Sequence, residues 1–309
     1  MPALRFDNRV AVITGSGRGL GRAYAELLAS LGAKIVVNDV GGSLQGEGAD
    51  AGPAREVVDA IKAAGGTAVA NTDSVATEAG GRAIIGSALD HFGRIDILIH
   101  NAGNVRRAPL REMSYDDFNA VLDVHLRGAF HVVREAFPHM CDQNYGRIVL
   151  TSSVSGLYGN KQVVNYATSK TGMIGLANVA GLEGAEHNVR CNIIAPGAVT
   201  RMAEGLDTSI YPPMGPELVA PLVAWMCHEQ CSVSGEILSA MAGRLSRMYL
   251  AETPGVYRSS WTVDEVDAQI AAIRDTGNDQ WILPPVPMGQ PDHIRKSFEM
   301  ARAGGAGRS

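Results

Sequence analysis

Residues 9–21 read R-V-A-V-I-T-G-S-G-R-G-L-G. Residues 9–14 form a short apolar run that is typical of a buried strand, and a helical pattern follows at 20–31. Glycines between a strand and a helix let the backbone approach a phosphate, which the free N–H groups at the helix N-terminus attract. The spacing of Gly15, Gly19 and Gly21 therefore indicates a loop for the pyrophosphate of a dinucleotide, with an ordinary tight turn as the alternative.

Strand and helix patterns continue to alternate after this loop. Short apolar runs predict strands at 34–39, 66–71, 95–100, 146–151, 189–195 and 236–239. Helical patterns occur at 53–64, 77–92, 115–141 and 163–187. Near-continuous apolar strands joined by helices predict an α/β fold, a doubly wound, Rossmann-like parallel sheet with helices on both faces.

Two segments depart from this alternation. The glycine-rich stretch 41–52, between the second strand and its helix, is interpreted as a flexible insertion loop. From about residue 245 the alternation stops and prolines become frequent. We therefore predict a dinucleotide-binding and catalytic domain at 1–244, and a C-terminal extension at 245–309 that packs on the core or on a partner subunit.

Composition and charge argue against several classes of protein. Of the 309 residues 46 % are hydrophobic, and the formal net charge of -5 argues against nucleic acid as a partner. No apolar run reaches the roughly 18 residues of a membrane span, and the N-terminus has no stretch resembling a signal peptide. The four cysteines show no disulfide spacing, and the chain ends G-R-S rather than S-K-L. We expect a cytoplasmic protein without a membrane or nucleic-acid partner.

An acidic residue at the end of the second strand bears on the choice of dinucleotide. Asp39 follows Gly21 by 18 residues, where an acid accepts hydrogen bonds from an adenosine ribose. Its carboxylate also repels a 2′-phosphate, which favours NAD over NADP. Arg18 argues the other way if its guanidinium holds that phosphate, and the alternative for Arg18 is a solvated side chain. We give Asp39 the greater weight and predict NAD.

The run Y-A-T-S-K at 166–170 places Tyr166 and Lys170 one helical turn apart. A free tyrosine has a pKa of about 10, and a fixed ammonium beside it stabilises the phenolate and lowers that pKa. Ser153 stands at the end of a predicted strand, where side chains face the ligand crevice. Together these residues predict hydride transfer, in which Ser153 holds the substrate oxygen and Tyr166 moves the proton. An ordinary helix surface is the alternative for the Tyr–Lys pair alone.

Five motifs in this order resemble the short-chain dehydrogenase/reductase family: T-G-x-x-x-G-x-G, Asn101-Ala-Gly103, the serine, Y-x-x-x-K and Pro196-Gly197. The resemblance covers about residues 6–243. It implies that Ser153 orients the substrate, that Tyr166 is the catalytic acid/base, and that Lys170 tunes the pKa of Tyr166 and binds a ribose. It also implies cofactor contacts from Gly15, Ser16, Arg18, Gly19, Leu20, Gly21, Asp39, Asp73, Ser74, Asn101, Ala102, Gly103, Tyr166, Lys170, Pro196, Gly197, Val199 and Thr200.

Four further runs resemble one branch of this family, the (3R)-hydroxyacyl-CoA dehydrogenase unit of peroxisomal multifunctional enzyme type 2. They are N-D-V-G-G at 38–42, V-H-L-R-G at 124–128, S-G-L-Y-G-N at 155–160 and A-P-L-V-A-W-M-C-H-E-Q-C at 220–231. The resemblance implies a lipid-metabolism enzyme that oxidises a 3-hydroxyacyl-CoA, with a fatty or steroid side chain, to the 3-oxoacyl-CoA. The alternatives are a hydroxysteroid dehydrogenase, a 3-oxoacyl carrier-protein reductase, and a nucleotide-sensing protein without catalysis.

Several other residues have two readings. His125 stands where most of the family carries an asparagine that supports a proton-relay water, and its alternative is a packed helix histidine. Arg106 and Arg107 are interpreted as contacts for CoA phosphates or as solvated side chains. Cys227 and Cys231, at i and i+4, share a helix face, but without a second pair of ligands we predict a packing cluster at a helix end and no metal site. Apolar residues on more than one face of the two long helices predict a homodimer or homotetramer, as the family usually forms.

Overall fold

The computed structural model describes residues 4–199, 212–277, 282, 294–295 and 298–303. The chain divides into two compact units, Met1–Arg247 and Met248–Ser309. The sequence predicted a boundary near the same place, at 244–245. That residues 245–309 pack on the core or on a partner stays a prediction.

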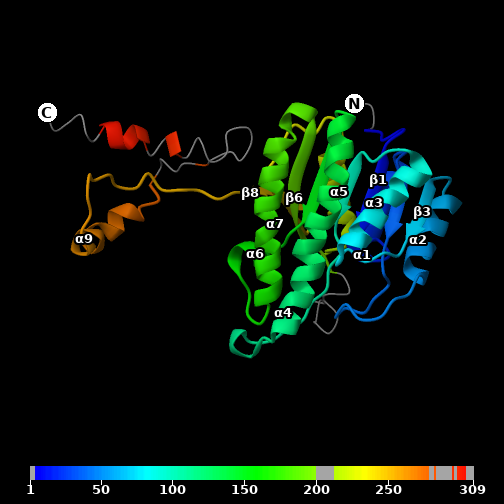
Figure 1. The fold of residues 1–309 in the computed structure, drawn as a ribbon, viewed down its shortest axis with the longest axis horizontal. Coiled ribbons are helices and arrows are strands. Elements are labelled where there is room, and N and C mark those ends of the chain that lie inside the picture. The colour runs from blue at the N-terminus through cyan, green and yellow to red at the C-terminus, as the bar shows by residue number, and fades with distance from the viewer. Residues whose placement is uncertain (1–3, 200–211, 278–281, 283–293, 296–297, 304–309) are drawn as a thin grey trace. The chain divides into compact units, whose positions relative to one another are not determined.

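The first unit is built on an eight-stranded sheet of order β3-β2-β1-β4-β5-β6-β7-β8 (Figure 1). The six pairings that join β1 to β7 are parallel, and this confirms the predicted doubly wound fold. The chain passes from β1 outward to β3 and then returns to place β4 on the other side of β1. This reversal opens a crevice at the carboxyl ends of β1 and β4. The strands are β1 Val10–Thr14, β2 Lys34–Asn38, β3 Thr67–Asn71, β4 Ile97–His100, β5 Gly146–Thr151, β6 Val189–Gly197, β7 Ile237–Met241 and β8 Arg244–Met248.

Helices cover both faces of the sheet (Figure 1). On one face α1 contacts α2 and α8, and on the other α5 contacts α3 and α7. The helices are α1 Gly19–Ser30, α2 Gly52–Ala63, α3 Glu78–Phe92, α4 Tyr115–Leu122, α5 Gly128–Asp142, α6 Val154–Tyr158, α7 Val164–Glu183, α8 Ala220–Cys227 and α9 Val263–Ile273.

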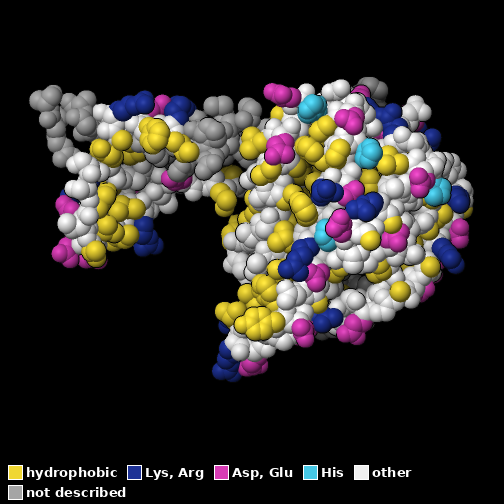
Figure 2. Space-filling view, in the orientation of Figure 1, with side chains coloured by type: hydrophobic (Ala, Val, Ile, Leu, Met, Phe, Trp, Pro, Cys, Tyr) yellow, Lys and Arg dark blue, Asp and Glu magenta, His cyan; other side chains and the backbone are white. Residues whose placement is uncertain are grey.

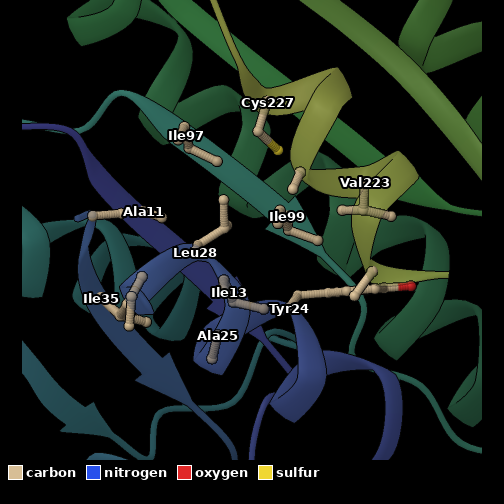
Figure 3. Close-up of a cluster of buried hydrophobic side chains, with 14 of the residues drawn as sticks. Ala11, Ile13, Tyr24, Ala25, Leu28, Ile35, Ile97, Ile99, Val223 and Cys227 are labelled. Atoms are coloured by element: carbon tan, nitrogen blue, oxygen red, sulfur yellow. The ribbon is translucent and has the colours of Figure 1, made fainter. Parts of the chain in front are cut away.

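The apolar strands are buried on both faces because their side chains alternate between two helical layers. Ala11 and Ile13 of β1 point toward Leu28 of α1 and Val223 of α8 (Figure 3). Val12, between them in sequence, is also fully buried but lies outside that cluster. Burial on both sides explains why these strands read as continuous apolar runs and not as an alternation of apolar and polar residues.

The long helix predicted at 115–141 is interrupted. Its first part, α4, ends at Leu122, and a π-helical turn, Asp123–Arg127, precedes α5. A π turn holds an extra residue per turn, so it changes which side chains face the core, and such turns occur often at functional sites. His125, in the middle of this turn, is completely buried.

One local expectation was wrong. Cys227 and Cys231 do not share a helix face, because α8 ends at Cys227 and His228 is extended; both thiols are buried. The segment 41–52, predicted to be a flexible insertion loop, has no regular structure before α2 and is folded back on itself; its flexibility stays a prediction. The N–H of Asp50 donates to Val40 O at 2.8 Å, and the N–H of Ser43 donates to Glu47 O at 2.7 Å.

The surface of the first unit carries exposed apolar side chains over α4 and α7 (Figure 2). Tyr115, Phe130 and Val179 are the large exposed ones of α4, α5 and α7. They agree with the apolar excess in the sequence, and the homo-oligomer inferred from it stays a prediction. No helix among the described residues has the length and apolar character to span a membrane.

The second unit contains α9, whose start is closed by a capping box. The Thr262 hydroxyl accepts the N–H of Glu265, and the Glu265 carboxylate accepts the N–H of Thr262. Arg258 pairs with Glu265 at 2.6 Å and lies over the Trp261 ring. These contacts satisfy the N–H groups that a helix start leaves free.

Candidate active site

A cavity of about 750 Å³ lies at the carboxyl ends of the central strands, where the strand order reverses. Its lining gathers residues that the sequence places far apart: Gly15, Arg18, Gly19, Leu20, Asp39, Asp73, Ser74, Asn101, Ala102, Gly103, His125, Ser153, Tyr166, Lys170, Pro196 and Gly197. All of them are predicted site residues. The reversal of strand order is what brings the glycine loop after β1 next to the turn after β4.

Four predicted residues are not part of this lining. Ser16 is buried behind it, and its hydroxyl donates to Ile13 O at 2.7 Å. Gly21 lies beneath the loop against the Gly15 carbonyl. The N–H of Val199 donates to Met214 O at 2.7 Å. Thr200 lies outside the described residues.

The glycine loop has the form that a pyrophosphate requires. Gly15 and Gly19 have positive φ angles of 64° and 53°, which favour glycine. A Cβ on Gly21 would lie 2.3 Å from Gly15 O, so a side chain there would displace the loop. The side chain of Arg18, at the N-cap of α1, makes no capping hydrogen bond in the described structure. No side chain caps the start of α1, which fits a helix N-terminus that binds a phosphate.

The hydroxyl of Thr14 joins the two walls of the crevice. It accepts the N–H groups of Asn101 and Ala102, each at 3.1 Å, and lies 3.1 Å from His100 Nδ1. Because the oxygen already accepts two hydrogen bonds, its own proton points to Nδ1. His100 then carries its proton on Nε2, which donates to His125 O at 3.1 Å. Burial, helped by the charge of Lys170, lowers the pKa of His100 to about 3, so this imidazole is neutral.

The carboxylate of Asp39 lies between the glycine loop and the segment after β2. One oxygen accepts the N–H of Gly17 at 2.8 Å and the other that of Gly41 at 2.7 Å. Beside it, Asn38 Nδ2 donates to Asp73 O at 2.9 Å and so positions the end of β3. Asp39 thus lines the cavity with lone pairs still available for a ribose hydroxyl.

Ser153, Tyr166 and Lys170 meet at the other end of the cavity. Ser153 is the N-cap of α6, and its hydroxyl accepts the N–H of Ser155 at 3.1 Å. Lys170 Nζ lies 5.3 Å from the centre of the Tyr166 ring and donates to Thr151 O. Ser152 donates to the Lys170 carbonyl at 2.8 Å, which joins α7 to the end of β5.

Burial is the main influence on the pKa values of Tyr166 and Lys170. Burial raises the pKa of Tyr166, while the hydrogen bond with Ser153 and the charge of Arg107 lower it. Lys170 is not among the groups that lower this pKa. Burial lowers the pKa of Lys170 itself to about 7, because an ammonium with 3 % exposure is poorly hydrated. That Lys170 together with a bound oxidised nicotinamide acidifies Tyr166 stays a prediction.

His125 packs edge-on against Tyr166, with ring centres 5.2 Å apart. Its Nε2 lies 2.8 Å from Asn104 O and 3.1 Å from Asn104 N. We assign the ring proton to Nε2, donating along the shorter contact, and in this tautomer Nδ1 is an acceptor with no partner among the described residues. Burial holds the pKa of His125 well below its usual value, with the charge of Lys170 contributing. A Cβ on Gly103 would lie 2.3 Å from the His125 ring, so only glycine lets the imidazole occupy this place.

The two arginines after β4 have different environments. Arg106 Nε donates to Gln45 O at 3.1 Å and pairs with Asp117 at 2.9 Å, so it is neither solvated nor free. Arg107 is exposed, and its charge reaches Tyr166.

Three residues at the site were not singled out from the sequence: Thr14, His100 and Asn104. Thr14 opens the glycine motif, and the other two flank Asn101-Ala-Gly103. Their positions beside these motifs were the only indication in the sequence. The pairing of Thr14 with His100 depends on the register between β1 and β4, which the sequence does not show. No group of three or more potential metal ligands is present in the described part of the chain.

Residues 9–209 match the protein family described as short chain dehydrogenase. The chain is 49 % identical over 253 residues to peroxisomal multifunctional enzyme type 2 of Drosophila melanogaster, covering 82 % of this chain and 42 % of that protein. It is 46 % identical over 253 residues to the peroxisomal hydratase-dehydrogenase-epimerase of Saccharomyces cerevisiae, covering 82 % of this chain and 28 % of that protein. The chain thus spans less than half the length of these relatives.

The fold agrees with a solved structure of the full-length peroxisomal multifunctional enzyme type 2 from Drosophila melanogaster. The TM-score is 0.80 at 38 % identity, over 96 % of this chain and 50 % of that chain. The names of these relatives contradict the cytoplasmic location expected from the sequence, because they are peroxisomal. That expectation rested on the last three residues and on the missing signal peptide, and neither is a physical property of the fold.

We expect Gly21→Ala to weaken dinucleotide binding about ten-fold or more. The added Cβ meets the Gly15 carbonyl at 2.3 Å, and a shift of the loop misaligns the N–H groups that face the phosphates. Titration of NADH fluorescence measures the dissociation constant. Gly86→Ala in α3 is the matched control, because its Cβ meets nothing within 4 Å and the change adds helix propensity. Equal affinities in the two variants would contradict this account of the loop.

The pKa of Lys170 predicts a pH dependence of stability in the protein without dinucleotide. Lysine in the unfolded chain titrates near 10.4 and Lys170 in the folded chain at about 7, so the unfolded chain binds more protons between these values. This residue's contribution to stability therefore rises with pH across that window and is lost as pH falls to 7. Relative to Lys170→Met, we expect the wild-type free energy of unfolding to gain up to about 1.4 kcal/mol per pH unit. Urea unfolding of both proteins at pH 7, 8 and 9 measures these free energies. If the difference between wild type and Lys170→Met does not change with pH, the pKa of Lys170 is not lowered in the folded chain.

Proposed function

The chain belongs to the short-chain dehydrogenase family, and from this premise we propose that it oxidises a 3-hydroxyacyl-CoA to the 3-oxoacyl-CoA with NAD. Family and relatives make it a nicotinamide-dependent dehydrogenase that acts on CH–OH groups. The observation that carries the proposal is the meeting of Ser153, Tyr166 and Lys170 in the cavity that also contains the glycine loop and Asp39.

Tyr166 removes the proton of the substrate hydroxyl in this proposal. Ser153 holds the same oxygen, and its hydrogen bond to the phenol favours the phenolate. A bound oxidised nicotinamide supplies the hydride acceptor and a positive charge. Since burial raises the pKa of Tyr166 in the protein alone, this extra charge is what makes the phenol acidic enough to act near neutral pH.

Lys170 and His125 complete the polar lining around Tyr166. Lys170 keeps one donor on Thr151 O and has others for a ribose hydroxyl. His125 offers its bare Nδ1 as an acceptor for a water or hydroxyl, and its backbone oxygen is taken by His100. We propose that the imidazole itself, and not the backbone at this position, supports the passage of the proton.

NAD is proposed over NADP because of the place of Asp39. Its carboxylate is fixed by two N–H groups at the cavity wall, where it repels a 2′-phosphate. Arg18 lines the same cavity but is exposed, so its guanidinium is well hydrated and compensates little.

The acyl-CoA substrate is supported by the four sequence runs that resemble the hydroxyacyl-CoA dehydrogenase branch and by the identity with peroxisomal multifunctional enzyme type 2. This chain covers only part of that enzyme's length. Initial rates on 3-hydroxyacyl-CoA of several chain lengths, on a free hydroxysteroid, and on a 3-oxoacyl carrier protein with NADPH test it. The proposal requires the rate on a 3-hydroxyacyl-CoA to be the fastest.

A homodimer or homotetramer is proposed from the exposed apolar residues of α4, α5 and α7.

Tyr166→Phe is expected to lower turnover at least about a thousand-fold while NADH still binds, since only the proton-transferring hydroxyl is removed. Absorbance of NADH measures turnover, and fluorescence measures binding. Tyr115→Phe is the control, because that phenol is 88 % exposed at the start of α4. Unchanged turnover of every tested alcohol by Tyr166→Phe would show that the acid/base is another group.

Asp39→Asn is expected to lower the preference for NAD over NADP, as a ratio of kcat/KM values, at least about ten-fold. The change removes the repulsion of a 2′-phosphate and keeps an oxygen acceptor. Asp59→Asn makes the same change in net charge on an exposed position of α2 and serves as the control. A ratio that moves equally in both variants would mean that Asp39 does not select the cofactor.

A further inference from the structure

The segment 43–47 forms one wall of the cavity. Ser43, Leu44 and Gly46 belong to the lining of the cavity, as does the preceding Gly42. The segment holds its own shape, because the N–H of Gly46 donates to Ser43 O at 3.1 Å and that of Glu47 donates to Ser43 Oγ at 3.2 Å. It is a preformed turn beside Asp39.

The chain after β4 holds this turn in place. The N–H of Val105 donates to Leu44 O at 3.0 Å, and Arg106 Nε donates to Gln45 O at 3.1 Å. At Gly46, with φ of 85°, a Cβ would lie 2.7 Å from Asn104 Nδ2, so the two segments are in close contact. These two hydrogen bonds and this contact join the turn 43–47 to residues 104–106.

Arg106 connects the turn to the helices that carry the site. Its guanidinium pairs with Asp117 of α4 at 2.9 Å and approaches Glu47 at 3.8 Å. Its carbonyl accepts Asn165 Nδ2 at 3.0 Å, immediately before Tyr166. Since its side chain is only 25 % exposed, these hydrogen bonds are partly shielded from water.

Asn104 indicates that this wall faces a ligand. It is 3 % exposed and lines the cavity, its Nδ2 donates to Ala120 O at 3.1 Å, and its Oδ1 has no partner among the described residues. A buried acceptor without a partner destabilises the folded chain. A hydroxyl or amide donor on a bound molecule would remove that destabilisation.

We propose that residues 104–106 clasp the turn 43–47 over the dinucleotide and that Arg106 sets how long the dinucleotide stays bound. The inference rests on the cofactor of the proposed function. A long ligand leaves most readily when the turn parts from 104–106, which breaks the bonds from Val105 and Arg106. Arg106 is a positioning residue in this scheme, since it acts through the turn and touches no reacting atom.

The test is the dissociation rate constant of NADH, followed by stopped-flow fluorescence after mixing with excess NAD. Arg106→Gln removes both the charge and the bond to Gln45 O, and we expect dissociation at least five-fold faster. Arg111→Gln is the matched control, because the Arg111 guanidinium is exposed and pairs with its neighbour Glu112 at 3.0 Å. Asp117→Asn keeps the guanidinium but weakens its anchor. We expect a smaller increase there, and this variant serves if Arg106→Gln does not fold.

A second measurement needs no cofactor. Cleavage after Glu47 by a glutamate-specific protease should be faster in Arg106→Gln than in Arg111→Gln, because the turn opens more often. Wild-type NADH binding with dissociation within two-fold in Arg106→Gln and Asp117→Asn would overturn the clasp alone. Failure of the unaltered protein to bind NADH would overturn the proposed cofactor and the clasp with it.

Discussion

The hydroxyl of Thr14 holds together the two halves on which the rest of the site depends. At the point where β1 and β4 end side by side, it accepts two backbone N–H groups from the β4 side and donates to His100. A reversal of strand order opens a crevice but does not by itself fix the distance between its walls. This one oxygen sets the glycine loop against Asn101 and Ala102, and through His100 it reaches the π-helical turn that carries His125.

Burial of polar groups is the common theme of the cavity. His100 and His125 are neutral because burial lowers the pKa of each imidazole. Burial also lowers the pKa of Lys170, to about 7. An interior of this kind strengthens each electrostatic interaction that a ligand brings. In the proposed mechanism, the charge that activates Tyr166 therefore arrives with the cofactor.

The fold was predictable because buried parallel strands must be apolar throughout, as the runs at Ile13, Val36 and Ile148 are. The glycine loop and the Tyr166–Lys170 pair were predictable because their chemistry constrains spacing. The π-helical turn around His125 was not, since one extra residue leaves no periodic trace in a helical pattern. The role of Arg106 was equally hidden, because its partner is a backbone oxygen of a segment with no regular structure.

The enclosure of Lys170 has a consequence for how the two redox forms of a dinucleotide load. With a pKa of about 7, the amine of the protein without a dinucleotide can gain or lose its proton near neutral pH. A positively charged oxidised ring disfavours the ammonium, whereas the uncharged reduced ring does not. Uptake of the two forms thus exchanges different amounts of H⁺ with the buffer. For the proposed cofactor, the balance between oxidised and reduced forms in the cavity would therefore vary with pH differently from their balance in solution.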